Sequence, residues 1–267
     1  MTGASFSPFD IYIETRKKRP LVYQITNRVS AQVQADTVAL LGGLSVMSDA
    51  KEEAAEIARK SDALLINLGT PRDDAFEIFS LALGAAQEKN VPAVLDLVGY
   101  GFTQYRTALA NKLLETFRFA IIKGNAAEIS ALAGAGKGPT GVSSNETAKD
   151  MGEIVRALST KYNACVFSTG EQDFLAGGDR CTATTGGSAY LGTLSGIGCA
   201  LGSAAALFSA GAPAFEAAFS ALLAFRCAAT KAAHGAKGPG SFYRNFQDEL
   251  ALLGSENVDW SVFYETR

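Results

Sequence analysis

Histidine is almost absent from this chain, because His234 is the only one among its 267 residues. Cysteine is also scarce, and the four that occur are far apart and form no C-x-x-C pair: Cys165, Cys181, Cys199 and Cys227. These shortages exclude an ordinary zinc site, and they exclude Ser-His-Asp or Cys-His catalysis unless His234 is central to it. His234 comes at the end of a predicted helix, where it is a favourable partner for the helix dipole.

A strong excess of charge is missing as well, since the net charge is −3 at pH 7 and the isoelectric point is near 5.4. This balance provides no basic surface for nucleic acid, so any phosphate-binding site must be local. The basic residues 16–19 have no apolar segment beside them of the kind found in signal peptides. The apolar stretch 200–225 is interrupted by serine, glycine, proline and glutamate, which predicts two buried helices and no membrane span. We therefore expect a cytoplasmic protein without nucleic-acid or membrane partners.

What the sequence does contain is a regular alternation of short apolar runs with helical patterns. The runs lie at 21–25, 44–47, 63–68, 93–96, 119–122 and 164–167. Continuous apolar strands that alternate with helices predict an α/β fold whose mostly parallel sheet is covered on both faces. Residues 172–185 have the pattern of a hairpin at one edge of the sheet, and residues 134–145 that of a surface loop. No change in composition divides the chain, so we expect one domain over residues 1–267.

Polar residues gather where the predicted strands end. They are Asn67, Gly69, Asp96, Gly99, Lys123, Asn125, Thr169, Gly170 and Glu171. Carboxyl ends of parallel strands meet at one edge of the sheet, which is where open α/β sheets bind ligands. Asp96 and Glu128 are carboxylates suited to Mg²⁺, and Lys123 is a cation suited to phosphate. Each also has a simpler explanation, as a turn residue, a first-turn carboxylate or a solvated strand end, but their shared edge favours a phosphate-transfer site.

A glycine-rich turn at residues 193–199 precedes an alanine-rich helix. Gly196 and Gly198 have no β-carbon, so backbone N–H groups can approach a ligand closely there. The helix N-terminus adds unpaired N–H donors and the positive end of its dipole, which suit a phosphate group. Cys199 lies in the first turn, where the dipole favours a thiolate. Alternatively, the turn only lets the helix pack closely on the sheet, with Cys199 a small buried side chain. Asn27, after the first strand, has a similar simple explanation as a helix N-cap.

Across residues 20–253 the chain resembles hydroxyethylthiazole kinases, which have the ribokinase-like fold. The matching segments are 20–22, 25–27, 45–47, 67–70, 96–99, 123–129, 168–170, 195–199 and 238–242. The resemblance implies a three-layer α/β/α sandwich and ATP-dependent phosphorylation of the hydroxyl of 4-methyl-5-(2-hydroxyethyl)thiazole, a step of thiamine salvage. Two alternatives stay open: a ribokinase-like kinase for another small alcohol such as a hydroxymethylpyrimidine, and a catalytically silent paralogue that binds thiazole or nucleotide.

The resemblance also implies roles for individual residues. Those implied to bind the alcohol are Asn27, Met47, Gly69 and Gly196. Those implied to bind the nucleotide are Lys123, Asn125, Thr169 and Gly198. Asp96 and Glu128 match the magnesium-associated acids, and Cys199 stands where more distant ribokinase-like enzymes carry an aspartate base. Family members form homotrimers with the substrate site at the subunit interface, to which Asn27 and Met47 would contribute.

The chain departs from the family pattern at four positions that bear on the site. Tyr23 replaces a histidine, Leu97 a proline, Lys123 an arginine and Ile197 a threonine. Lysine keeps the charge of arginine but loses its bidentate fork. Ile197 lacks the threonine hydroxyl, although its backbone N–H remains available to an anion. These departures concern the identity of the substrate and the efficiency of the reaction more than the fold.

Overall fold

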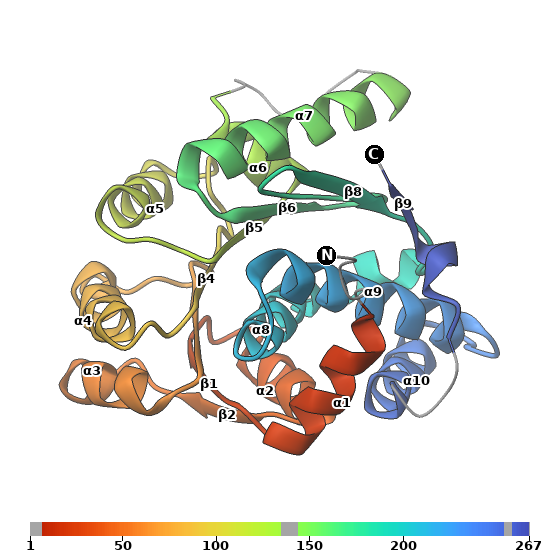
Figure 1. Ribbon diagram of the computed structural model, residues 1–267, viewed down its shortest axis with the longest axis horizontal. Coiled ribbons are helices and arrows are strands. Elements are labelled where there is room, and N and C mark those ends of the chain that lie inside the picture. The colour runs from red at the N-terminus through yellow and green to blue at the C-terminus, as the bar shows by residue number, and fades with distance from the viewer. Residues whose placement is uncertain (1–6, 135–143, 254–257, 267) are drawn as a thin grey trace, which may run out of the picture.

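A nine-stranded sheet lies between two layers of helices in the computed structural model, which describes residues 7–134, 144–253 and 258–266 (Figure 1). The strands, in chain order, are β1 Leu21–Ile25, β2 Leu44–Met47, β3 Ala63–Asn67, β4 Ala93–Asp96, β5 Ile121–Asn125, β6 Cys165–Thr169, β7 Asp173–Gly177, β8 Arg180–Thr184 and β9 Tyr264–Thr266. Their spatial order is β2-β1-β3-β4-β5-β6-β7-β8-β9. Strands β1 to β6 are parallel to one another, and the pairings β6–β7, β7–β8 and β8–β9 are antiparallel. The mostly parallel sheet predicted from the apolar runs is therefore confirmed.

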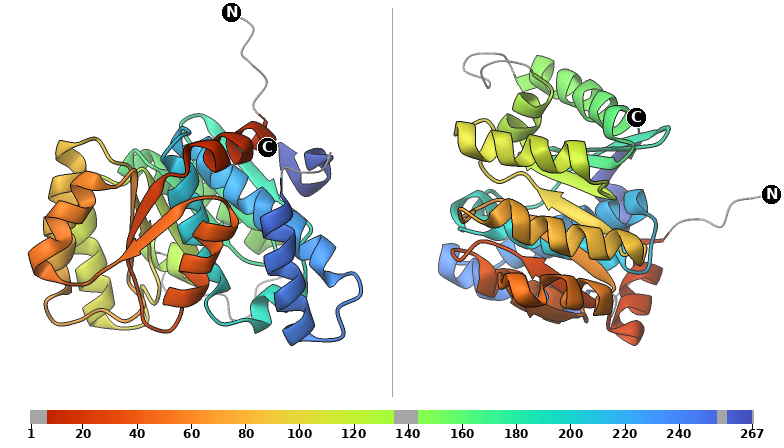
Figure 2. Two further views of the ribbon diagram at one scale, coloured as in Figure 1. Left: turned by 90° about the horizontal axis from the view of Figure 1, so that it is seen from below. Right: turned by 90° about the vertical axis from the view of Figure 1, so that its left-hand side faces the viewer.

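In the described chain, helices cover both faces of the sheet, and the alternation of side chains along each strand divides the core between the two layers. On the outer face they lie in a row (Figure 2): α3 Lys51–Lys60, α4 Ala75–Glu88, α5 Gln104–Thr116, α6 Ala126–Leu132 and α7 Ser144–Tyr162. On the inner face lie α2 Ala31–Leu40, α8 Ile197–Ser209 and α9 Ala214–Ala233, and α1 Pro8–Lys18 and α10 Pro239–Leu252 pack against these helices. In β3, for example, Leu65 packs on the inner side while Leu64 and Ile66 pack on the outer side. The expected three-layer α/β/α sandwich is the observed arrangement.

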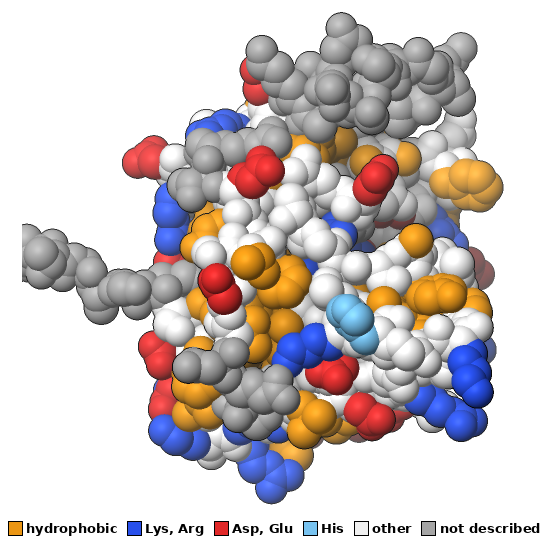
Figure 3. Space-filling view, turned by 90° about the vertical axis from the view of Figure 1, so that its right-hand side faces the viewer, with side chains coloured by type: hydrophobic (Ala, Val, Ile, Leu, Met, Phe, Trp, Pro, Cys, Tyr) orange, Lys and Arg blue, Asp and Glu red, His pale blue; other side chains and the backbone are white. Residues whose placement is uncertain are grey.

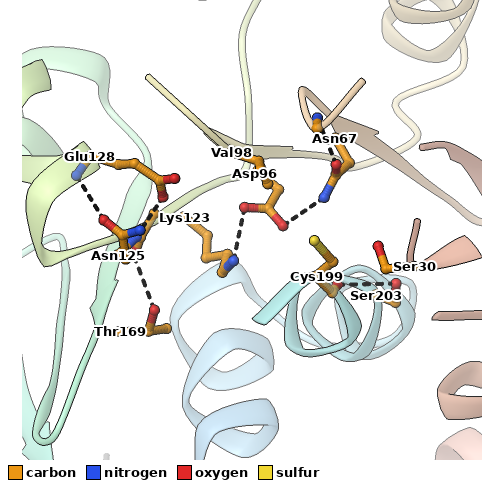
Figure 4. A network of polar contacts seen from close by, with 12 residues as sticks. Ser30, Asn67, Asp96, Val98, Lys123, Asn125, Glu128, Thr169, Cys199 and Ser203 are labelled. Atoms are coloured by element: carbon orange, nitrogen blue, oxygen red, sulfur yellow. Dashed lines mark hydrogen bonds and ion pairs between the residues drawn. The ribbon is translucent and has the colours of Figure 1, made fainter. Parts of the chain in front are cut away.

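The alanine-rich helices α8 and α9 are the two buried helices predicted for residues 200–225. Small side chains such as Ala200 and Ala204 are fully buried and let α8 lie close to the sheet. The N-terminal end of α8 lies next to the carboxyl ends of the central strands (Figure 4) and forms part of the site described below. Among the described residues, no helix is both long and apolar enough to cross a membrane.

Two parts of the chain differ from the sequence-based expectation. The predicted hairpin is β7–β8, but it is not at the edge, because β9 pairs with β8 and takes the outermost position. A strand of three residues is too short to show a period of its own. The helix α1 was not predicted either, and it is held by the Tyr12 hydroxyl, which donates to the Ser220 carbonyl at 2.6 Å.

Two further expectations concern the surface. The loop expected at residues 134–145 falls mostly on 135–143, outside the described residues, and Ser144 and Asn145 already belong to α7. His234 follows α9 as its C-cap and is exposed. Histidine is the single pale-blue side chain on the face shown in Figure 3. Its position at the helix end is the one predicted.

Candidate functional site

The polar ends of three neighbouring strands meet in one buried group. In the register of the sheet, Asn67 of β3 lies beside Asp96 of β4, and Asp96 lies beside Lys123 of β5. The Asn67 side-chain amide donates to Asp96 Oδ2 at 2.8 Å, and Lys123 Nζ donates to Asp96 Oδ1 at 2.8 Å (Figure 4). Asp96 is completely buried, and the other two are almost so. The predicted gathering of strand-end side chains is thus real for these three.

Burial and pairing act against each other in the Asp96–Lys123 pair. Burial raises the pKa of Asp96 to about 6, against the charge and hydrogen bond of Lys123, while the charge of Glu128 adds to the rise. Burial lowers the pKa of Lys123, but the charges of Asp96 and Cys199 outweigh it, so this pKa stands above its usual value. Both groups are therefore charged at neutral pH, and the ammonium is a local positive charge inside the sheet edge.

The start of α8 lies directly against this pair because two glycines permit it. A β-carbon on Gly202 would lie 3.2 Å from Asp96 Oδ2, and one on Gly196, which has a φ of +85°, would lie 2.6 Å from the β-carbon of Ser30. The first intrahelical bond runs from the Ala200 N–H to the Gly196 carbonyl. The N–H groups of residues 197–199 precede that bond, so they face outward as donors for an anion.

Cys199 lies in this first helical turn and is the only one of the four cysteines that is not buried. Its Sγ accepts a hydrogen bond from the Asn27 side-chain amide at 3.5 Å, and the same amide donates to Asn67 Oδ1 at 2.8 Å. Cys199 is therefore not the fully buried side chain of the simpler alternative. The N-cap role of Asn27 is also wrong, because α2 begins at Ala31 after Ser30. Asn27 instead accepts from the backbone and hydroxyl of Ser30 and connects Cys199 to the buried group.

Glu128 and Asn125 form a capping box at the start of α6. Asn125 Oδ1 accepts from the Glu128 backbone at 2.9 Å, and Glu128 Oε2 accepts from the Asn125 backbone at 2.7 Å. Glu128 Oε1 accepts from the Gly99 backbone at 2.7 Å, which ties the loop after β4 to α6. The simpler explanation of Glu128 as a first-turn carboxylate is therefore also present in the structure.

The carboxylates of Asp96 and Glu128 suit Mg²⁺ only if phosphate oxygens and water supply its other ligands. Among the described residues, no cluster of three or more His, Cys, Asp or Glu side chains could hold a metal alone. Mg²⁺ in phosphate-transfer sites takes one or two carboxylates and completes its shell with water and phosphate oxygens. Asp96 and Glu128 are two carboxylates close enough for one charge to raise the pKa of the other. Each of their oxygens has a second lone pair beyond the hydrogen bond it accepts. The two residues therefore fit a magnesium ion shared with a phosphate chain.

A cleft of about 740 Å³ opens beside the start of α8. Three of the four residues expected to bind a nucleotide line it: Asn125, Thr169 and Gly198. Lys123 does not line it, but its Nζ lies 3.7 Å from where a β-carbon on Gly198 would be. The ammonium group is thus behind the cleft wall, at the helix start, rather than at the end of a solvated strand.

Two of the residues expected to bind the alcohol, Asn27 and Gly69, lie beside the buried Asn67 near Cys199. The Gly69 backbone donates to Asn67 Oδ1 at 3.0 Å, so Gly69 and Asn27 share one buried partner. Met47 stands apart at the end of the edge strand β2, where it is opposite Gln24 and partly exposed. Its strand is joined to the interior by Gln24, whose side-chain amide donates to Ser45 Oγ at 2.7 Å.

Sequence reasoning missed two sets of buried polar residues. One joins β1, α2 and α8: Ser203 Oγ of α8 donates to Gln24 Oε1 of β1 at 2.6 Å and lies 3.2 Å from Gln34 Oε1 of α2. The other is an ion pair between Arg226 and Asp173. The available signal was the same in each case, namely a polar side chain within an otherwise apolar strand or helix.

Comparison with known proteins agrees with this arrangement. A family model of the hydroxyethylthiazole kinase family matches residues 13–256. The chain belongs to this family. A hydroxyethylthiazole kinase of Thermoanaerobacter pseudethanolicus is 39% identical over 255 residues, which are 94% of this chain and 97% of that protein. The solved structure of the hydroxyethylthiazole kinase protein from Pyrococcus horikoshii OT3 has a TM-score of 0.87 at 32% identity, and covers 97% of this chain and 98% of that one.

More distant structures share the fold alone. The pyridoxal kinase from Staphylococcus aureus is 20% identical, with a TM-score of 0.58 over 79% of this chain and 88% of its own. The resemblance inferred from the motifs and the ribokinase-like fold class are therefore confirmed.

The residues expected to depart from the family pattern have definite structural surroundings. Leu97 is fully buried, and its backbone N–H donates to the Lys123 carbonyl at 2.9 Å, a bond that a proline cannot make. The hydroxyl of Tyr23, also fully buried, donates to the Ser48 carbonyl at 3.1 Å and holds the loop after Met47. Ile197 is buried and lines the cleft with its side chain.

Proposed function

We propose that this kinase transfers the γ-phosphoryl group of ATP to the hydroxyl of 4-methyl-5-(2-hydroxyethyl)thiazole, and that the reaction takes place at the N-terminus of α8. One observation carries the proposal. Cys199 is partly exposed between the cleft that contains Thr169 and the residues Asn27 and Gly69, and the buried Asp96–Lys123 pair lies behind it. A nucleotide in the cleft and an alcohol beside Asn27 would meet at this sulfur.

In the proposed reaction, the substrate hydroxyl lies at Cys199 and passes its proton to Sγ. Its oxygen forms a bond to the γ-phosphorus while the bond from that phosphorus to the bridging oxygen breaks, and ADP leaves. The Asn27 amide donates to this sulfur, and the Lys123 ammonium is a positive charge nearby. The N–H groups of residues 197–199 stabilise the charge on the transferring phosphoryl group.

Two groups would assist this step from the edge of the sheet. Asp96 and Glu128 would hold Mg²⁺, which neutralises charge on the phosphate oxygens when it is bound. Lys123 places a positive charge beside Gly198 and holds Asp96 in position. Asn125 and Thr169 contribute polar groups to the cleft for the rest of the nucleotide.

We also propose a homotrimer in which another copy covers the β2 edge. The support is that none of the four side chains of β2 is buried, and that Leu44 at its start is 43% exposed. Met47 would complete an alcohol site shared between subunits. Sedimentation equilibrium should give three times the 27.9 kDa of one chain. A stable monomer at micromolar concentration would contradict both the assembly and the interface role of Met47.

The deciding experiment is a coupled assay of ADP release with ATP, Mg²⁺ and hydroxyethylthiazole. Turnover should exceed that with a hydroxymethylpyrimidine by a large factor. A preference for the pyrimidine would assign another small alcohol as the substrate. Binding of thiazole and nucleotide without ADP release would show a silent paralogue. When Cys199→Ala is assayed in the same way, its matched control is Cys227→Ala, which removes a buried thiol of α9 outside the site.

A further inference from the structure

A second buried ion pair lies at the cleft and takes no part in the proposed reaction. Arg226 in α9 and Asp173 at the start of β7 are 7% and 5% exposed. The Arg226 Nε donates to Asp173 Oδ2 at 2.7 Å, and Nη2 lies 2.7 Å from Oδ1. This two-point contact fixes the plane of the guanidinium as well as its distance from the carboxylate.

The same guanidinium also holds the two loops that border the cleft. Nη2 donates to the Gly170 carbonyl at 3.0 Å, in the loop between β6 and β7. Nη1 donates to the Gly186 carbonyl at 2.8 Å, in the loop between β8 and the 3₁₀ helix Ala189–Thr193. Gly170, Gly186, Asp173 and Arg226 all line the cleft. One side chain of α9 thus sets the distance between both walls.

Each loop has a second attachment to the same group of residues. The Gly170 N–H donates to Asp173 Oδ1 at 3.1 Å, and the Gly187 N–H donates to the hydroxyl of Thr230, one turn beyond Arg226 in α9, at 2.8 Å. Gly186 and Gly187 both have positive φ, a conformation that only glycine adopts easily. Without attachments such loops sample many shapes, and ordering them on ligand binding weakens the affinity.

We infer that Arg226 and Asp173 are positioning residues that hold the nucleotide cleft open in its binding shape before a nucleoside triphosphate enters. The inference rests on the proposed function, which assigns this cleft to ATP. Lysine in place of Arg226 keeps the charge, but it cannot contact a carboxylate and two carbonyls from a planar fork. The expected consequence is a loss of nucleotide affinity with the reaction step itself preserved.

The experiment compares Arg226→Lys with Arg180→Lys. Arg180 of β8 pairs with Glu216 of α9 at 2.6 Å, so it joins α9 to the other strand of the β7–β8 hairpin, but its side chain is 52% exposed and it does not line the cleft. The dissociation constant of a non-hydrolysable ATP analogue and both KM values are measured well below each variant's Tm. Arg226→Lys should weaken the analogue and raise KM for ATP by about tenfold or more. Its kcat and KM for the alcohol, and all constants of Arg180→Lys, should stay within about twofold.

Thr230→Val supplies a graded test if Arg226→Lys does not fold. It removes only the hydroxyl that accepts from Gly187, so the loss of analogue affinity should be about two- to fivefold. A folded Arg226→Lys, or a Thr230→Val, with unchanged analogue affinity would overturn the inference while leaving the proposed function intact. Equal losses for ATP and alcohol would also overturn it, because they indicate a general structural role. Wild-type protein that does not bind the analogue would overturn the proposed function together with the inference.

Discussion

The proposed reaction centre and the cleft wall each contain a buried ion pair, and the two pairs differ in geometry. Lys123 contacts Asp96 through a single 2.8 Å bond, and a lysine ammonium has two more donors that it can turn toward another anion. Arg226 contacts Asp173 at two points and gives its remaining bonds to loop carbonyls. If the proposed function holds, Lys123 can turn toward an arriving phosphate, whereas Arg226 is fixed by its contacts with the carboxylate and the two loops. A buried charge pair is therefore not in itself a sign of catalysis, and the geometry of the cation separates the two cases.

Removing the carboxylate charge of each ion pair in turn should give the largest difference between the two pairs. Asp96→Asn should lower kcat by about 10³-fold, because it removes a charge that balances Lys123 and would help hold Mg²⁺ at the reacting phosphate. Asp173→Asn should leave kcat within about tenfold and act mainly on the unfolding free energy and KM for ATP. Steady-state kinetics of both variants gives kcat and KM for ATP, and separate urea titrations give the free energy of unfolding. Equal losses of kcat would show that the two pairs do not differ in function.

Cys199→Ala gives the next effect, a loss of about 10- to 1,000-fold in kcat, toward the lower part of the range for a general base. The protein should still fold and bind both ligands, because Sγ makes a single hydrogen bond, with Asn27. Single-turnover measurements separate the chemical step from binding. If kcat is unchanged, the thiol only packs and the substrate hydroxyl needs no base.

The burial of Asp96 should also affect how the free energy of unfolding depends on pH. Its pKa stands near 6 when folded, whereas an exposed aspartate titrates near pH 3.9. Between these values the folded state binds more protons, so this group makes the protein less stable as the pH rises. Relative to wild type, Asp96→Asn should therefore gain up to about 3 kcal/mol of unfolding free energy between pH 4 and 7. Urea unfolding in the absence of Mg²⁺ and nucleotide measures it, and a pH-independent difference between the proteins would contradict it.

Lys123→Ala should raise KM for ATP by about tenfold and KM for the alcohol much less, since the ammonium lies beside Gly198 of the cleft. The control is Lys89→Ala, which removes an exposed ammonium at the end of α4. A selective rise in KM for the alcohol would mean that the two half-sites are assigned the wrong way round.

The two ion pairs also show what could be predicted from the sequence. Asp96 and Lys123 were found because each ends an apolar strand, and parallel strands bring their carboxyl ends together whatever their separation in the chain. The sequence did not reveal that they pair with each other, because side-chain partners depend on the register between β4 and β5. Arg226 meets Asp173 across 53 positions and between a helix and a strand, a contact with no local period. A lone arginine within an apolar helix signals that a buried partner exists, but not which residue it is.

The smallest effect is expected at Ile197, where the chain departs from the family pattern without removing any group that the proposed mechanism uses. Ile197→Thr should change kcat/KM for hydroxyethylthiazole by less than about tenfold, or about 1.4 kcal/mol. The anion would be bound by the backbone N–H groups of the α8 start, and these are set by Gly196 rather than by the neighbouring side chain. Ile197→Val is the matched control, because it keeps the β-branch and tests the loss of volume in the cleft without adding a hydroxyl.

The opposite result would change the interpretation of the whole site. If wild type is inactive and Ile197→Thr combined with Leu97→Pro restores turnover, these two residues have disabled a former kinase. Leu97→Pro alone removes the N–H that donates to the Lys123 carbonyl, so its effect on activity shows whether that extra bond between β4 and β5 holds Lys123 away from the nucleotide. Restored turnover would mean that an active and a silent protein differ around the Asp96–Lys123 pair. The Arg226–Asp173 pair would then be common to the active and the silent protein.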